Sequence, residues 1–327
     1  MKWTFVLRVD RNKSLKPDNK KHRNKNKNMQ KGKFDLINQL IWITPALFLL
    51  FLFAYYSIYI LFKRGFDQHG GYSKNFTFSW RYLKMVWNDA DFIIGIKNSF
   101  IYVVIAIPIS LLISLLIAKC LADIVNKKIF AFLQSLFFMP FVTTALAITM
   151  AFSAIFSSTD QSLLEQLLKK LGVGFVDFRK PVNAKMILIF YGIWKMMPFK
   201  IIMFTVALSA VDKKLYSAAS IDGMAKWKQF WAISIPQIIP IIIYMITTSM
   251  IGAFKYMPLG LFGDYNAVMQ SKAQTMVYYI FENMVQTQNY GKASAASIIL
   301  MIIIGIMTIV NRFITKTLSK KYKSEAI

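Results

Sequence analysis

Six long apolar runs constrain the fold of this chain more than any other feature. Each is long enough for an α-helix to cross the ~30 Å hydrocarbon core of a membrane, which takes about 20 residues. The runs occupy residues 36–62, 98–118, 129–156, 186–211, 238–257 and 293–314. Lipid offers the backbone no hydrogen-bond partners, so each run must satisfy its own polar groups as a helix. The sequence therefore predicts an all-α integral membrane protein with about six transmembrane helices.

The charge of the chain fits the same interpretation. Forty Lys and Arg against 15 Asp and Glu give a net charge of +25. The basic residues concentrate in residues 1–35 and in alternate loops, as the positive-inside rule expects of a membrane protein. We therefore expect cytoplasmic N- and C-termini and no nucleic-acid partner. Residues 1–35 are too polar to form a core, so they predict a disordered cytoplasmic tail that touches anionic lipid, followed by a transmembrane domain over 36–327.

The residues that catalysis would need are missing from the apolar runs. The two histidines, His22 and His69, fall in the tail and in a loop, and Cys120 is the one cysteine. No HExxH, paired Asp or GxSx motif occurs at membrane depth, and the sequence has no glycine-rich phosphate loop with Lys and Ser or Thr. The sequence therefore predicts no metal site, no cofactor and no ATP hydrolysis by this chain. An intramembrane enzyme is disfavoured, and a passive channel is the other alternative outside active transport.

Two further patterns concern the helices. Pro108 and Pro140 lie inside predicted spans, and helix-breaking residues at membrane depth are common in transporters. The leucines of residues 162–171 fall on one helical face, which predicts an interfacial helix on the outer surface.

The longest polar interruption on the basic side is the loop 211–236. Asp212 is placed to cap a helix from Lys213 to Asp222, and Gly223 is placed to end it. A second amphipathic stretch, 227–235, leads to Pro236. The small residues of the first helix would let another protein approach its backbone closely, so the loop predicts a docking element.

The spacing within this loop resembles a known motif. Ser217-Ala218-Ala219, three residues, Gly223, nine residues and Ile233-Ser234-Ile235-Pro236 are similar to the "EAA" loop of the membrane subunits of binding-protein-dependent ATP-binding-cassette importers. The family's glutamate is Ser217 here, and its leucine is Ile235. The Ile221-Asp222-Gly223 sequence is typical of the sugar-importer branch.

Other segments resemble the carbohydrate permeases of the maltose and glycerol-phosphate type in the same order. They are Ile43-Thr44-Pro45-Ala46, Asn98-Ser99-Phe100, Met139-Pro140, Trp194 to Phe199 and Tyr290 to Ala295. The external segment 261–271 departs from the branch because it lacks a Gly-Gly-Pro sequence. A permease for amino acids, polyamines or metals ranks second, since those branches lack this combination of motifs.

The resemblance implies a mechanism and partners. The chain would pair with a second permease, most often as a heterodimer, in a bacterial plasma membrane. Two ATPase subunits would dock on the loop 211–236, and an extracellular sugar-binding protein or lipoprotein would deliver the sugar. The implied ATPase-coupling residues are Asp212, Leu215, Ser217, Ala218, Ala219, Asp222, Gly223, Ile233 and Pro236. Asp212 is a candidate for the carboxylate that Ser217 does not supply.

Polar and aromatic residues at membrane depth are candidates for the substrate pathway, because rings stack on sugars and polar groups bind hydroxyls. They are Tyr191, Trp194, Lys195, Tyr244, Thr247, Thr248, Lys255 and Tyr256. An intramembrane lysine is a functional candidate because an unpaired charge there is costly. Structural alternatives stay open: Lys195 can stabilise a break near Pro198, and Lys255 can extend to the outer interface.

Overall fold

The computed structural model describes residues 38–73, 75–156, 166, 169–171, 180–257, 260–262 and 265–325. This part of the chain is helical, with one isolated antiparallel bridge between Asp67 and Phe78. The predicted tail 1–35 and most of the predicted interfacial helix 162–171 lie outside it. The chain divides into two compact units, residues 1–60 and 61–327. The first unit contributes most of the helix Asn38–Gly65, which includes a π-helical turn, Phe51–Tyr55, before α2, Tyr56–Gly65.

Within the described residues, five helices are long and apolar enough to span a membrane. They are Asn38–Gly65, Ala90–Ala122 (α4), Pro181–Ser209 (α8), Lys226–Phe254 and Tyr290–Lys316, the last being part of α14, Tyr290–Glu325. The helix Lys226–Phe254 consists of α10 (Lys226–Gln229), a π-helical turn (Phe230–Ser234) and α11 (Ile235–Phe254). The connecting helices are α3 (Arg81–Trp87), α9 (Lys213–Ile221), α12 (Tyr265–Gln270) and α13 (Met276–Phe281), and a π-helical turn, Glu282–Gln286, follows α13.

The third predicted span, 129–156, is not one straight helix. It forms α5, Lys127–Val142, and α6, Ala145–Ile155, with a 93° bend between them. Pro140 stays inside α5, and the break falls after it, at Thr143 and Thr144. Thr143 has extended backbone angles, and the Thr144 hydroxyl accepts the Ala147 N–H as an N-cap. Threonine favours this capping role over the helix interior. We therefore attribute the break to Thr143 and Thr144 and not to Pro140.

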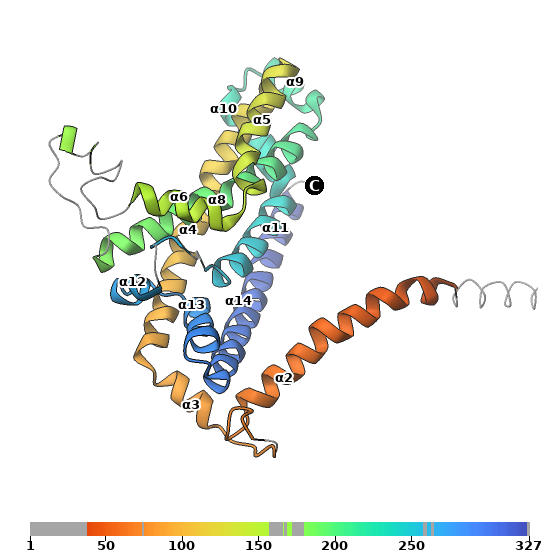
Figure 1. The fold of residues 1–327 in the computed structure, drawn as a ribbon. Coiled ribbons are helices and arrows are strands. Elements are labelled where there is room, and N and C mark those ends of the chain that lie inside the picture. The colour runs from red at the N-terminus through yellow and green to blue at the C-terminus, as the bar shows by residue number, and fades with distance from the viewer. Residues whose placement is uncertain are drawn as a thin grey trace, which may run out of the picture. The chain divides into compact units, whose positions relative to one another are not determined.

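Helices α4 and α8 form the centre of the bundle, α11 and α13 pack beside them, and α14 packs against α11 and α13 (Figure 1). Small residues allow close approach: Gly192 of α8 faces the Tyr102 ring of α4 with no room for a Cβ. Ala295 and Ala296 of α14 are buried in the same core as Tyr102. Sequence periodicity could not assign these partners, because each helix is apolar around most of its surface.

Hydrogen bonds hold the first turns of α4 against residues 272–276. The Asn98 side-chain amide donates to the carbonyls of Lys272 (2.8 Å) and Gln274 (2.9 Å), and the Ser99 hydroxyl accepts the Met276 N–H (3.2 Å). The Asn98-Ser99 pair noted in the sequence therefore holds a segment more than 170 residues away.

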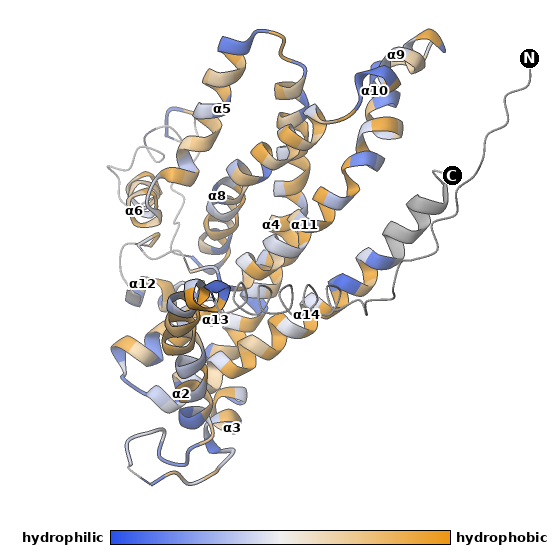
Figure 2. Ribbon diagram, turned by 90° about the vertical axis from the view of Figure 1, so that its right-hand side faces the viewer, coloured by the Kyte–Doolittle hydropathy of each residue, from blue (hydrophilic) through white to orange (hydrophobic). Residues whose placement is uncertain are grey.

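Apolar and polar residues separate along the bundle. Orange, apolar residues predominate on α4, α11 and the first part of α14, whereas blue residues gather around α10 and at the start of α9 (Figure 2). Many large apolar side chains of these helices are exposed, such as Val104 and Leu112 on α4 and Ile306 on α14. Exposed apolar helix faces fit a lipid environment, where they need no further cover.

Candidate functional site

The loop 211–236 folds as the sequence predicts at its start. Asp212 accepts the Lys214 N–H (2.9 Å) and caps α9, and Gly223 ends the turn with φ of +74°. A Cβ at Gly223 would meet nothing within 4 Å, so the left-handed backbone and not space favours glycine there. The second stretch, 227–235, is helical but continues directly into the fifth span. Its π-helical turn lies just before Pro236, where proline removes a helical donor.

Three buried contacts fasten α9 to the membrane helices. The Tyr216 hydroxyl and the fully buried Ser234 hydroxyl are 2.6 Å apart. The Gln229 side chain donates to the Ser220 hydroxyl (3.0 Å) and to the Met224 carbonyl (2.8 Å). Tyr216 of α9 also packs against a buried cluster that contains Phe230, Leu115 of α4 and Leu208 of α8. A force on α9 would therefore reach the ends of three spans.

The exposed residues of α9 combine small and apolar side chains with two lysines, Lys213 and Lys214, in its first turn. Ser217 and Ala218 are exposed, Leu215 is 42% exposed and Ile221 is 87% exposed. Ala219, predicted to share the docking face with Ala218, is instead buried against this chain. The Ser217 hydroxyl donates to the Lys213 carbonyl of its own helix (3.2 Å). Ile221 is not among the predicted coupling residues, although it lies beside Asp222 and Gly223 in the motif and is the most exposed large apolar residue of α9.

The other predicted coupling residues have different surroundings. Asp222 is exposed at the end of α9, while Ile233 and Pro236 are partly buried in the helix that enters the membrane. Ile233 packs on the buried cluster below α9. These two residues position the loop and do not lie on its outer face.

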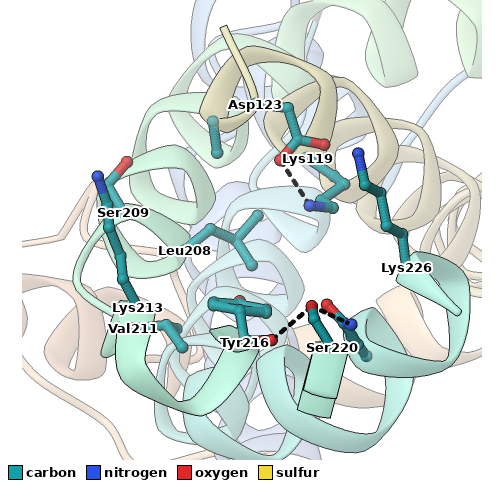
Figure 3. Close-up of a pocket in the computed structure, with 11 residues that line it drawn as sticks. Lys119, Asp123, Leu208, Ser209, Val211, Lys213, Tyr216, Ser220 and Lys226 are labelled. Atoms are coloured by element: carbon teal, nitrogen blue, oxygen red, sulfur yellow. Dashed lines mark hydrogen bonds and ion pairs between the residues drawn. The ribbon is translucent and has the colours of Figure 1, made fainter. Parts of the chain in front are cut away.

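A cavity of 440 Å³ opens beside α9, between the ends of α4 and α8 and the start of α10 (Figure 3). Lys119 and Asp123 form an ion pair of 2.6 Å on its wall, and Lys213 and Lys226 line it as well. The ion pair belongs to one helix end and is partly exposed, so it contributes little to stability. No sequence pattern indicates this cavity, because its walls come from three separate segments.

A second cavity, of 240 Å³, lies at membrane depth between α4, α5, α8 and α11. Lys195, Thr248 and Tyr256, which the sequence predicted for the substrate pathway, line it. The lining also includes residues that were not predicted, namely Tyr102, Phe141, Met196, Phe199, Lys200, Met245, Ser249 and Gly252. The Tyr102 and Tyr256 rings stack at 4.4 Å, and the Phe141 and Phe199 rings stack at 5.7 Å.

Lys195 meets the bent third span. Its ammonium donates to the carbonyls of Pro140 (2.6 Å) and Thr143 (3.2 Å), where the bend leaves backbone acceptors without helical donors. The break near Pro198 that the sequence suggested is absent from α8, which runs without interruption through this residue. Lys195 of α8 thus stabilises the break between α5 and α6 and not one in its own helix. Only the packing of these helices against each other shows this.

Lys200 is 2% exposed and donates to the Ser110 hydroxyl of α4. It was missed even though it carries the same signal as Lys195, a lysine inside an apolar run.

Five other pathway candidates do not line the cavity. Tyr191 and Trp194 pack against Phe152 of α6, and Tyr244 and Lys255 are exposed. The Thr247 hydroxyl accepts a hydrogen bond from Asn311 of α14 (2.6 Å). Helix rotation decides which side of each span faces the cavity, and the sequence did not determine it.

Comparisons with known proteins agree with this architecture. A probable ABC transporter permease of Mycoplasma pneumoniae is 28% identical over 86% of this chain and 88% of its own length. The arabinooligosaccharides transport system permease of Halalkalibacterium halodurans is 25% identical over 86% of this chain and 88% of its own. A chain of the bacterial alginate ABC transporter, solved in complex with an alginate pentasaccharide-bound periplasmic protein, shares the fold. Its TM-score is 0.76 at 20% identity, covering 89% of this chain and 98% of that one.

Residues 95–322 match the family described as the binding-protein-dependent transport system inner membrane component. The match includes α4 from residue 95 onward, α8, α9, α11 and all but the last residues of α14, and therefore both cavities and the whole loop. The protein is a multi-pass, non-catalytic membrane subunit, and it belongs to the family of inner membrane components of binding-protein-dependent ABC transporters.

Proposed function

We propose that the chain is one of two permease subunits of a sugar importer, with the loop 211–236 as the element that an ATPase subunit moves. The supporting observation is the fastening of α9: Tyr216, Gln229 and Phe230 tie it to the spans, while its outer face stays open. A docking element needs both properties, because it must be accessible to its partner and rigidly joined to the part that moves. Relatives named for arabinooligosaccharides, lactose and glycerol phosphate support a sugar or sugar derivative as the substrate.

In this proposal α9 lies in the cytoplasm with both termini, and residues 1–35 form a basic tail before a transmembrane permease domain, 36–327. Two ATPase subunits bind the α9 helices of this chain and of a second, similar permease. ATP binding draws the ATPases together, and the fastened helices carry the motion to α4, α8 and α11. The membrane cavity between these helices then changes its access, and an extracellular binding protein delivers the sugar.

Ile221 is the residue whose change tests the docking face. Burying an exposed isoleucine stabilises a complex by about 1.5–3 kcal/mol, so Ile221→Asp should reduce the ATPase retained by the tagged chain by roughly tenfold or more. The measurement is a gentle detergent purification with quantitative mass spectrometry of the co-eluting proteins. Val125→Asp is the matched control, since Val125 is 95% exposed in the loop between α4 and α5.

Three results would decide the proposal. The proposal is supported if an ATPase and a second permease co-elute with wild type and with Val125→Asp, and the ATPase is lost with Ile221→Asp. Equal ATPase retention by both variants contradicts the docking face. A wild-type chain that elutes without any ATPase contradicts the importer itself.

A further inference from the structure

The membrane cavity carries two positive charges and no negative one. Of its eleven lining residues, Lys195 and Lys200 are the ionisable cations and none is Asp or Glu. The sequences of α5, α8 and α11 contain no carboxylate either, and Asp91, the one acidic residue of α4, lies in its first turn. The charge on this wall is therefore not balanced by the helices that form it.

The groups that contact the two ammonium ions are neutral. Lys200 donates to the Ser110 hydroxyl, and Lys195 donates to two backbone carbonyls. An ammonium ion has three N–H donors, so these contacts leave two on Lys200 and one on Lys195 for a ligand. A cation at membrane depth costs about 2.5 kcal/mol or more. An anion in the cavity would offset that cost, whereas a neutral ligand would only hydrogen-bond.

The remaining walls suit one sugar ring. The stacked Tyr102–Tyr256 and Phe141–Phe199 pairs offer flat apolar surfaces, and Ser249 offers a hydroxyl. The volume of 240 Å³ lies below the ~300 Å³ at which sites for drug-sized ligands begin. The cavity therefore fits a single sugar unit better than a long oligosaccharide in one piece.

We propose that this cavity selects anionic solutes and that the transported molecule is a sugar unit bearing a carboxylate or a phosphate, bound by Lys200 and Lys195. The proposal rests on the transport function proposed above. It assigns Lys200 to charge recognition and Lys195 to a double role, as a ligand donor and as the residue that holds the bend of the third span.

The test compares three probes with the same ring: glucose, glucuronate and glucose 6-phosphate. The importer that co-purifies with the tagged chain is reconstituted in phosphatidylcholine alone, so that no anionic lipid occupies the cavity. Binding is measured by calorimetry. A charged hydrogen bond contributes more than a neutral one, so at least one anionic probe should bind about tenfold or more tightly than glucose. The two anionic probes distinguish carboxylate from phosphate.

Variants assign the effect to the cavity. Lys200→Met should remove the preference for the anion, and Lys200→Arg, which keeps the charge, should retain most of it. Lys97→Met is the matched control, because Lys97 is exposed on α4 and does not line the cavity. Lys195→Gln provides an independent loss of charge if Lys200→Met fails to assemble.

The outcomes are distinct from those of the docking test. An anion preference that Lys200→Met abolishes and Lys97→Met preserves supports the proposal. Glucose binding as tightly as the anions, binding of no probe at millimolar concentration, or an anion preference that survives both Lys200→Met and Lys195→Gln overturns it. In each of these cases the importer proposal is still supported if the ATPase co-purifies with wild type and is lost with Ile221→Asp.

Discussion

At the scale of single residues, Gly223 fixes the direction in which the chain leaves α9. Its N–H and that of Met224 donate to the carbonyls of Ser220 and Ala219, which closes the end of the helix. This closure needs a left-handed backbone, and glycine adopts it without the steric cost that a Cβ brings. The motif spacing of the sequence thus has a physical reason at this position.

Gly223→Ala should lower the free energy of unfolding by about 1 kcal/mol, because the alanine Cβ opposes the left-handed backbone. The measurement is thermal unfolding of the purified chain in detergent. Asn adopts this backbone more readily than Ala, so Gly223→Asn should lie between wild type and Gly223→Ala. An alanine variant as stable as wild type would show that the turn tolerates another conformation.

At the scale of helices, the contact between α4 and α8 depends on one missing side chain. The Tyr102 ring occupies the space where a Cβ of Gly192 would be. Helices this close gain dispersion contacts along their whole length, but they tolerate no added volume at the crossing.

Gly192→Ala should destabilise the chain by about 1–3 kcal/mol, since either the Tyr102 ring or the α8 backbone must move. The same substitution at Gly305 of α14, where nothing lies within 4 Å of the added Cβ, should cause no loss. Thermal unfolding of both variants is the measurement. Equal melting temperatures for the two would contradict the tight crossing.

The bend of the third span also depends on one side chain, that of Lys195 in α8, which donates to the backbone at the bend. Lys195→Met would leave the Pro140 and Thr143 carbonyls without their side-chain donor, so we expect the backbone between α5 and α6 to become more mobile. A spin label on Val142→Cys, in a Cys120→Ser background, reports that mobility by its spectral line shape. Lys195→Arg, which keeps a donor, should restore the wild-type spectrum, and an unchanged spectrum in Lys195→Met would exclude this role.

At the scale of the whole molecule, hydrogen bonds and an ion pair join segments that are far apart in the sequence. Asp89 caps α4 through the Asp91 N–H and accepts hydrogen bonds from the Tyr279 hydroxyl (2.8 Å) and the Lys292 ammonium (3.3 Å). Burial alone would raise the pKa of the Asp89 carboxyl, but these bonds outweigh it and hold the pKa below its usual value. This group connects the starts of α4 and α14 to α13.

Since the pKa of Asp89 is lower in the folded state, its stabilising effect is complete above the unfolded pKa of about 3.9 and is lost as pH falls through the folded pKa. Asp89→Asn should therefore melt below wild type at pH 6, and the difference should shrink steadily below about pH 3.9. Asp123→Asn removes an exposed pair within one helix and should change stability by about 0.5 kcal/mol or less. A pH-independent difference for Asp89→Asn would contradict the assignment.

The sequence by itself determined the features that depend on neighbouring residues. Run length set the number of spans, and Asp212 and Gly223 set the ends of α9, because capping and backbone handedness are local properties. The family motif was recognisable for the same reason, because it consists of residue types at fixed separations along the chain.

Only the tertiary structure decided which residues meet. It buried Ala219, placed Lys195 on the Pro140 carbonyl, and turned Lys200 rather than Tyr244 toward the membrane cavity. A span that is apolar on nearly all sides has no periodicity to fix its rotation, so neighbouring helices fix it through contacts such as Gly192 with Tyr102. The bend at Thr143 also needed a donor from another helix, and no local pattern encodes that partner.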